Sequence, residues 1–152
     1  MRNKARDAMP ADHSVTEIRI RNEIAELERV SEAMERIGKE HGLASKTLVQ
    51  LQVALDETVS NVIKYAWPQG GSHEICVRIM VGTGEVRLEI VDDGRPFDPL
   101  SAPAPTVLPP GQRPTPGGVG LHMVRQFMDS IEYARVDGAN RLTLTKLYDT
   151  NR

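Results

Sequence analysis

A long apolar stripe at helical spacing constrains the fold of this chain more than any other feature. Apolar residues recur every three or four positions at Leu48, Leu51, Leu55, Val59, Val62 and Ala66. This spacing puts them on one face of an α-helix, and that face must be buried against another layer. Ser45 is the expected N-cap, and Pro68 with Gly70 and Gly71 should end the helix. The chain therefore needs a core helix with a second layer to cover it.

The chain before this helix predicts a strand and a second amphipathic helix. Apolar residues within 15–20 indicate a short strand, and residues 24–41 carry apolar side chains at three-four spacing. Asn22 is the expected cap of that helix, and Gly42 suits the C′ position at its end.

The chain after the core helix alternates apolar and polar residues, which is typical of half-buried antiparallel strands. Four such strands are predicted, at residues 75–81, 86–91, 131–136 and 142–147. Gly82-Thr83-Gly84 and Asp137-Gly138 are the expected hairpin turns, and a short helix follows residues 117–120. The order predicts an α+β fold: a two-layer sandwich with helices on one face of a mostly antiparallel mixed sheet.

Composition excludes several classes of function. The chain has 152 residues and a net charge of -2, with 19 Lys plus Arg against 21 Asp plus Glu. This balance argues against a nucleic-acid or anionic-membrane surface, and no apolar run reaches the ~20 residues that span a bilayer. The single cysteine, Cys76, favours a reducing, cytoplasmic setting. We expect one domain over residues 14–148, with tails at 1–13 and 149–152.

Residues 96–116 contain eight of the ten prolines. Proline at this density prevents both helices and ladder pairing. Only 36 residues follow this segment, which are too few to form a stable second domain. We therefore favour a lid or binding loop over an interdomain linker.

Three clusters carry candidate chemistry, and each has an ordinary alternative. Glu57 and Asn61 are four residues apart on the flank of the core helix, where two solvated polar residues would look the same. Asp92-Asp93-Gly94 lies at a strand end, where an Asp can direct its carboxylate at a ligand while the glycine lets the backbone approach that ligand closely. Asp-Gly is also a common turn dipeptide. Gly117-Gly118-Val119-Gly120 precedes a helix. Glycines at this place can direct main-chain N–H groups at a phosphate, or they can form a flexible hinge for the lid.

The order and context of these clusters resemble the GHKL-type ATPase domain, the Bergerat ATP-binding fold shared by gyrase and histidine kinases. LDETVSN at residues 55–61 resembles its N box, VDDGRPFDP at 91–99 its first glycine box, and GGVGL at 117–121 its second. The resemblance covers roughly residues 14–148 and is strongest to stand-alone anti-sigma factors that are also serine-protein kinases. It implies a histidine-kinase-like ATP-binding domain with a lid at about residues 96–116.

The resemblance implies two roles on the core helix. Asn61 would coordinate Mg²⁺ through its side-chain oxygen, and Glu57 would act on the attacking hydroxyl as a general base or orienting group. Histidine kinases often carry Lys-Tyr at the positions of Lys64 and Tyr65, with the Lys near phosphate and the Tyr near the base. A solvated helix lysine is an equal alternative for Lys64.

The resemblance also implies the residues that hold ATP. Asp92 would accept a hydrogen bond from the adenine amino group, and Gly94 would let the backbone pass close to the base. The other expected contacts are Phe97, Gly117, Gly118, Val119, Gly120 and Leu121.

Two of the chain's departures from the family pattern bear on the expected site. Pro96 replaces the second glycine of the first box. Asn140 or Arg141 replaces a threonine near the start of the last strand, and Thr143 is the substitute that we include among the candidate contacts.

The implied function is an anti-sigma regulatory factor with protein-serine kinase activity. It would sequester a sigma factor and phosphorylate a STAS-type antagonist with Mg·ATP, as a homodimer and without direct contact to nucleic acid or membrane. Residues ahead of the first strand are too few for a phosphoacceptor hairpin, so a complete histidine kinase is not expected. Two alternatives stay open: a nucleotide-binding module that sequesters a partner without catalysis, and a detached histidine-kinase catalytic domain.

Overall fold

Three α-helices and five strands make up the part of the chain that the computed structural model describes, residues 13–99 and 118–150. The strands are β1 (Ser14–Arg21), β2 (Glu74–Gly82), β3 (Glu85–Asp92), β4 (Ser130–Val136) and β5 (Ala139–Leu147). The helices are the short 3₁₀ helix η1 (Ile24–Glu26), α2 (Leu27–Glu40), α3 (Ser45–Tyr65) and α4 (Gly118–Phe127).

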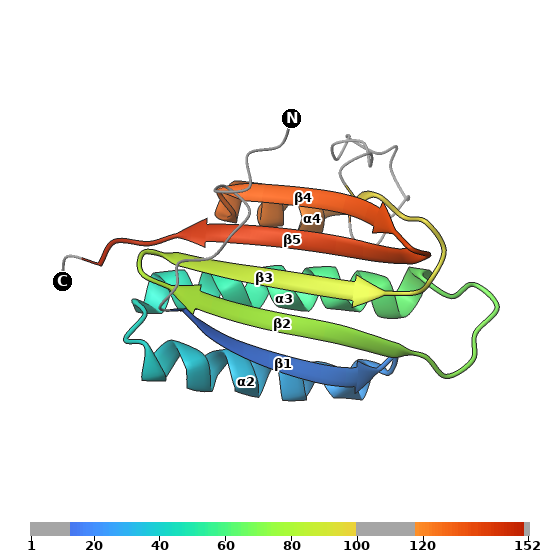
Figure 1. Cartoon of the computed structure of the whole chain (residues 1–152), viewed down its shortest axis with the longest axis horizontal. Coiled ribbons are helices and arrows are strands. Elements are labelled where there is room, and N and C mark those ends of the chain that lie inside the picture. The colour runs from blue at the N-terminus through green and yellow to red at the C-terminus, as the bar shows by residue number, and fades with distance from the viewer. Residues whose placement is uncertain (1–12, 100–117, 151–152) are drawn as a thin grey trace, which may run out of the picture.

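The strands form one sheet in the order β1-β2-β3-β5-β4, and every pairing between these described strands is antiparallel. All three α-helices lie behind one face of the sheet, as Figure 1 shows. This arrangement confirms the predicted α+β sandwich. The central strands β3 and β5 are far apart in the sequence and pair Asp92 with Asn140 at the end of the ladder.

The hydrophobic core lies between the two layers. Inward side chains of β2 and β3 alternate as predicted, with Val77, Leu88 and Ile90 at most 1% exposed. Leu51 and Val59 of α3 pack against them and are fully buried. The apolar stripe that predicted the core helix is thus the centre of the core.

Two predicted helix caps are wrong. Asn22 accepts the His73 N–H at 2.8 Å and donates to the Gly71 carbonyl at 3.0 Å, so it ties β1 to the segment before β2 instead of capping a helix. Ser45 is the first residue of α3, whose N-cap is Ala44 with no side-chain cap. Gly42 does take the expected left-handed conformation, with φ of 64° after α2.

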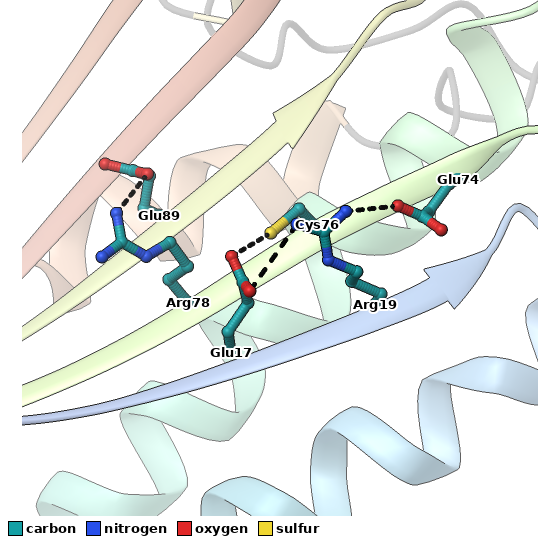
Figure 2. A network of polar contacts seen from close by, with 6 residues as sticks. All are labelled: Glu17, Arg19, Glu74, Cys76, Arg78 and Glu89. Atoms are coloured by element: carbon teal, nitrogen blue, oxygen red, sulfur yellow. Dashed lines mark hydrogen bonds and ion pairs between the residues drawn. The ribbon is translucent and has the colours of Figure 1, made fainter.

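The outer face of the sheet carries alternating charges (Figure 2). Arg19 pairs with Glu74 at 2.9 Å, and Arg78 with Glu89 at 3.4 Å. The Cys76 thiol donates to Glu17 at 3.2 Å, and burial followed by this contact raises the pKa of Cys76 to about 11. The thiol is therefore neutral, and weakly nucleophilic, at physiological pH.

No helix among the described residues is long and apolar enough to cross a membrane. The expected lid falls largely on residues 100–117, outside the described ranges, as does most of the expected tail at 1–13.

Candidate functional site

A mostly apolar pocket lies between α3 and the ends of β3, β5 and β4. Its apolar walls include Val62 and Ala66 of α3, Ile90 of β3 and Leu142 of β5. The polar side chains that line it are Thr58, Asn61, Asp92, Tyr133 and Asn140. The space beside its lining atoms is about 440 Å³ when the open solvent at its mouth is included. Apolar walls with a few convergent polar groups are typical of a small-molecule site.

Asp92 is the acidic group of the pocket and is 5% exposed. Its Oδ1 accepts the Gly94 N–H at 2.9 Å and the Asn140 Nδ2 at 3.0 Å. Burial raises the pKa of Asp92, while the two donated hydrogen bonds act in the opposite direction. The carboxylate is therefore held in one orientation by groups that favour its ionised form.

Gly94 allows the loop after β3 to pack directly on the end of α3. The Arg95 N–H donates to the Ala66 carbonyl at 2.8 Å, and the Arg135 guanidinium donates to the Gly94 carbonyl at 2.7 Å. A Cβ at residue 94 would lie 2.5 Å from both the Cβ and the carbonyl oxygen of Ala66. The glycine is thus required by contact with a helix end, a reason that the sequence pattern did not reveal.

Gly94→Ala is therefore expected to destabilise the fold by about 1–3 kcal/mol, the usual range for forcing extra atoms into a packed site. Chemical denaturation would measure the loss. Adding Ala66→Gly removes only the Cβ contact and leaves the clash with the carbonyl oxygen, so it should restore only part of the stability. Full stability of Gly94→Ala alone would show that the loop can move away from α3 at no energetic penalty.

Asn140 is a site residue that the sequence reasoning did not select. Its amide donates to Asp92 and, at 2.8 Å, to the Arg95 carbonyl, while its Oδ1 accepts the Tyr133 hydroxyl at 2.5 Å. The residue is 5% exposed. Asn140 lies two residues before the inward Leu142 on β5, so alternation puts it on the core face. A polar residue at a core-facing strand position was the sequence signal that could have identified it.

Glu57 and Asn61 lie on the same side of α3, one turn apart. Asn61 is 5% exposed and lines the pocket, whereas Glu57 is half-buried and lies beyond the pocket lining. Lys64 is exposed and Tyr65 half-buried, and neither lines the pocket. The structure therefore brings Asn61 together with Asp92 and leaves Lys64 and Tyr65 outside the pocket lining.

The remaining candidates divide between the pocket and its surroundings. Phe97 and Leu121 line the pocket. Gly118, Val119 and Gly120 form the first turn of α4, and Gly117 lies outside the described residues.

The structure does not bring Thr143 into the pocket. It follows the inward Leu142 on β5, so its side chain points to the opposite, outer face of the sheet. The inward position near the start of β5 belongs to Asn140, which takes the place that we gave to Thr143.

Comparison with known proteins decides the family. A family model described as the histidine kinase-like ATPase domain matches residues 20–146. The chain belongs to this family. The matched range contains all the described pocket residues of this histidine kinase-like ATPase domain, from Thr58 to Leu142.

Two curated relatives are named as protein kinases. The serine/threonine-protein kinase BtrW of Bordetella bronchiseptica is 32% identical over 112 residues, which are 74% of this chain and 79% of BtrW. The serine-protein kinase RsbW of Bacillus licheniformis is 28% identical over 127 residues, covering 76% of this chain and 74% of RsbW.

Solved structures share the fold of this ATPase domain. The structure of the RsbU and RsbW domains of Rv1364c from Mycobacterium tuberculosis matches with a TM-score of 0.61 at 17% identity, over 88% of this chain and 32% of that one. The histidine kinase domain from Erythrobacter litoralis EL346 matches with a TM-score of 0.52 at 16% identity, over 82% of this chain and 60% of that one. The chain thus spans about a third of the first solved chain and three fifths of the second.

Proposed function

We propose that this chain is an ATP-dependent anti-sigma regulatory factor with protein-serine kinase activity. It would sequester a sigma factor and phosphorylate a STAS-type anti-sigma antagonist, acting in the cytoplasm as a homodimer. The observation that carries the proposal is the buried Asp92 pocket beside Asn61, on the same helix as Glu57. The kinase names of the two relatives support the activity.

The lining of the pocket suits an adenine ring. The apolar walls match the faces of a flat heterocycle, and Asp92 supplies one acceptor for an amino group. Oδ1 of this carboxylate already accepts two donors, whereas Oδ2 has no hydrogen-bond partner within the described residues. The free oxygen is therefore the one that would accept the adenine amino group.

The residues of α3 and α4 fit the phosphates and a magnesium ion. Asn61 would hold Mg²⁺, and main-chain N–H groups at the start of α4 would hold phosphate oxygens. The described residues contain no cluster of three His, Cys, Asp or Glu that could ligate a metal alone. A single side-chain ligand such as Asn61 suits Mg²⁺, which usually takes one or two side chains together with substrate phosphates. When bound, the ion would supply neutralising charge at the phosphates.

Glu57 would act on the acceptor hydroxyl. It lies one helical turn before Asn61 on the same side of α3, so in the proposed complex it would face the phosphates instead of the base. Its carboxylate would orient the serine hydroxyl of the antagonist and accept its proton as the phosphoryl group is transferred.

Asp92→Asn is expected to weaken ATP binding about 10- to 150-fold, because the charge-assisted hydrogen bond to the base is worth roughly 1.5–3 kcal/mol. The fold should lose little, since the amide oxygen can still accept the Gly94 and Asn140 donors and burial already disfavours the charge. Titration calorimetry with thermal unfolding measures both effects. Wild-type ATP affinity in a folded variant would remove Asp92 from the base site.

The proposed kinase activity is tested by phosphate transfer from ATP to purified STAS-type proteins. Acid stability of the product separates the possibilities, since phosphoserine survives acid treatment and phosphohistidine does not. An acid-stable product supports the proposal, and an acid-labile product indicates a detached histidine-kinase domain. No transfer, with ATP-dependent capture of a sigma factor, indicates a sequestering module without catalysis.

A further inference from the structure

We propose that Asn140 is a positioning residue that, together with Tyr133, presents Asp92 to the base as an acceptor and thereby selects 6-aminopurine over 6-oxopurine nucleotides. The inference rests on the proposed nucleotide site and adds a determinant of its specificity. It does not depend on the kinase activity or on the protein partners.

The hydrogen bonds of the Asn140 amide determine its orientation. Nδ2 donates to Asp92 Oδ1 at 3.0 Å and to the Arg95 carbonyl at 2.8 Å, so both of its hydrogens have acceptors. Oδ1 accepts the Tyr133 hydroxyl at 2.5 Å, and the Phe97 N–H lies 3.5 Å from the same oxygen. A rotated amide would place its oxygen against two acceptors, Asp92 Oδ1 and the Arg95 carbonyl, and its NH₂ beside the Phe97 N–H. Only one orientation therefore satisfies this buried group.

Tyr133 maintains this orientation from the neighbouring strand. It lies on β4, opposite Leu142 in the β4–β5 pairing, and both residues line the pocket. Its hydroxyl donates to Asn140 Oδ1, which leaves the amide hydrogens directed at Asp92 and the Arg95 carbonyl. A tyrosine, an asparagine and an aspartate from three strands thus form one directed chain of hydrogen bonds.

The end of this chain determines what the pocket presents to a base. Asp92 Oδ1 receives two donors, from Asn140 and from the Gly94 main chain, and these donors favour the ionised carboxylate. Oδ2 is then an acceptor without a hydrogen to donate. A 6-amino group donates to such an oxygen, whereas a 6-oxo group would place two acceptors in contact in a buried site, which is strongly unfavourable.

The test measures the ratio of ATP to GTP affinity by titration calorimetry in the full-length chain. A ratio is informative because both nucleotides bind the same folded molecules, so a general loss of folded protein cancels. The two variants are Asn140→Asp and Tyr133→Phe. The matched control is Arg141→Gln, on the outer face of β5, which makes the same change in net charge as Asn140→Asp.

Asn140→Asp keeps the shape of the side chain but replaces the donor beside Asp92 with an acceptor. Two carboxyl groups this close in a buried site would share one proton, so Asp92 would no longer be held as an ionised acceptor and the ratio should fall by about tenfold or more. Tyr133→Phe removes one hydroxyl and should lower the ratio by about two- to tenfold. Arg141→Gln should leave the ratio unchanged.

Ratios that stay within twofold of wild type in both variants would overturn the role of Asn140, as would a wild-type protein that does not prefer ATP. If Asn140→Asp fails to unfold cooperatively, Tyr133→Phe decides, and an unchanged ratio in that variant overturns the proposal. A wild-type chain that binds neither nucleotide would instead reject the proposed nucleotide site. A wild-type chain that prefers ATP but transfers no phosphate would reject only the kinase activity.

Discussion

Glu57→Gln is expected to lower phosphorylation of a STAS-type antagonist by about 10²–10⁴, the usual contribution of a general base. Glutamine keeps the size of the side chain and a hydrogen bond but cannot take the proton of the serine hydroxyl. Nucleotide binding should stay within a few-fold of wild type, because Glu57 lies outside the pocket that Asp92 and Asn61 line. Single-turnover transfer of labelled phosphate measures the rate, and calorimetry measures the binding.

Asp56→Asn is the matched control for this variant. Asp56 is the neighbouring carboxylate on α3, but it is exposed and lines a groove with Leu27 and Ser31 beside α2. The Asp56→Asn variant should transfer phosphate at the wild-type rate. Transfer at the wild-type rate by Glu57→Gln would reject the catalytic role of Glu57. Absence of transfer by the wild type, with sigma-factor capture in ATP, would instead favour the sequestering module.

Asn61→Ala is expected to abolish the magnesium-dependent part of ATP binding. Alanine removes the only side-chain oxygen that residue 61 can offer to the ion, and the phosphate charge then stays without this neutralising contact. Affinity should fall to the value that wild type shows in EDTA. Calorimetry with and without Mg²⁺ measures the difference.

Asn61→Asp separates the metal contact from packing in this test. Aspartate retains an oxygen ligand at nearly the same size, so magnesium dependence should survive. Because Asn61 is only 5% exposed, thermal unfolding of both variants checks that the fold is retained. Unchanged Mg·ATP affinity in Asn61→Ala would show that the ion is held elsewhere.

Much of the fold could be predicted because local rules determine its elements. The three-four stripe from Leu48 to Ala66 predicted α3, and alternation with Asp137-Gly138 predicted the β4–β5 hairpin. The cap assigned to Asn22 was wrong because its partners, Gly71 and His73, are about 50 residues away in the sequence. A local capping rule has no information about such partners.

The candidate site was predictable where the motifs carry it together and not where the fold assembles it. Asp92 and Asn61 could be selected because their motifs occur in the order and context of the family pattern, and the structure places both in one pocket. Alternation along β5 could have placed Asn140 on the core face, but only the register that pairs β3 with β5 puts it opposite Asp92. The outward direction of Thr143 follows from the same register. Whether these residues bind ATP and magnesium stays a prediction.

The contact between Ala66 and the loop after β3 has a consequence for how nucleotides of different length are distinguished. Glu57 and Ala66 are nine residues apart on one continuous helix and its cap, about 13.5 Å along the axis. The loop that contains Gly94 and Arg95 is held on the Ala66 end, while Glu57 lies about two and a half turns earlier on the helix and Asn61 lies between them. In the proposed complex, a base bound at Asp92 would thus present its phosphate chain at a constant spacing from Glu57. A diphosphate and a triphosphate would then differ in whether they reach that point along α3, without any change in how the base is bound.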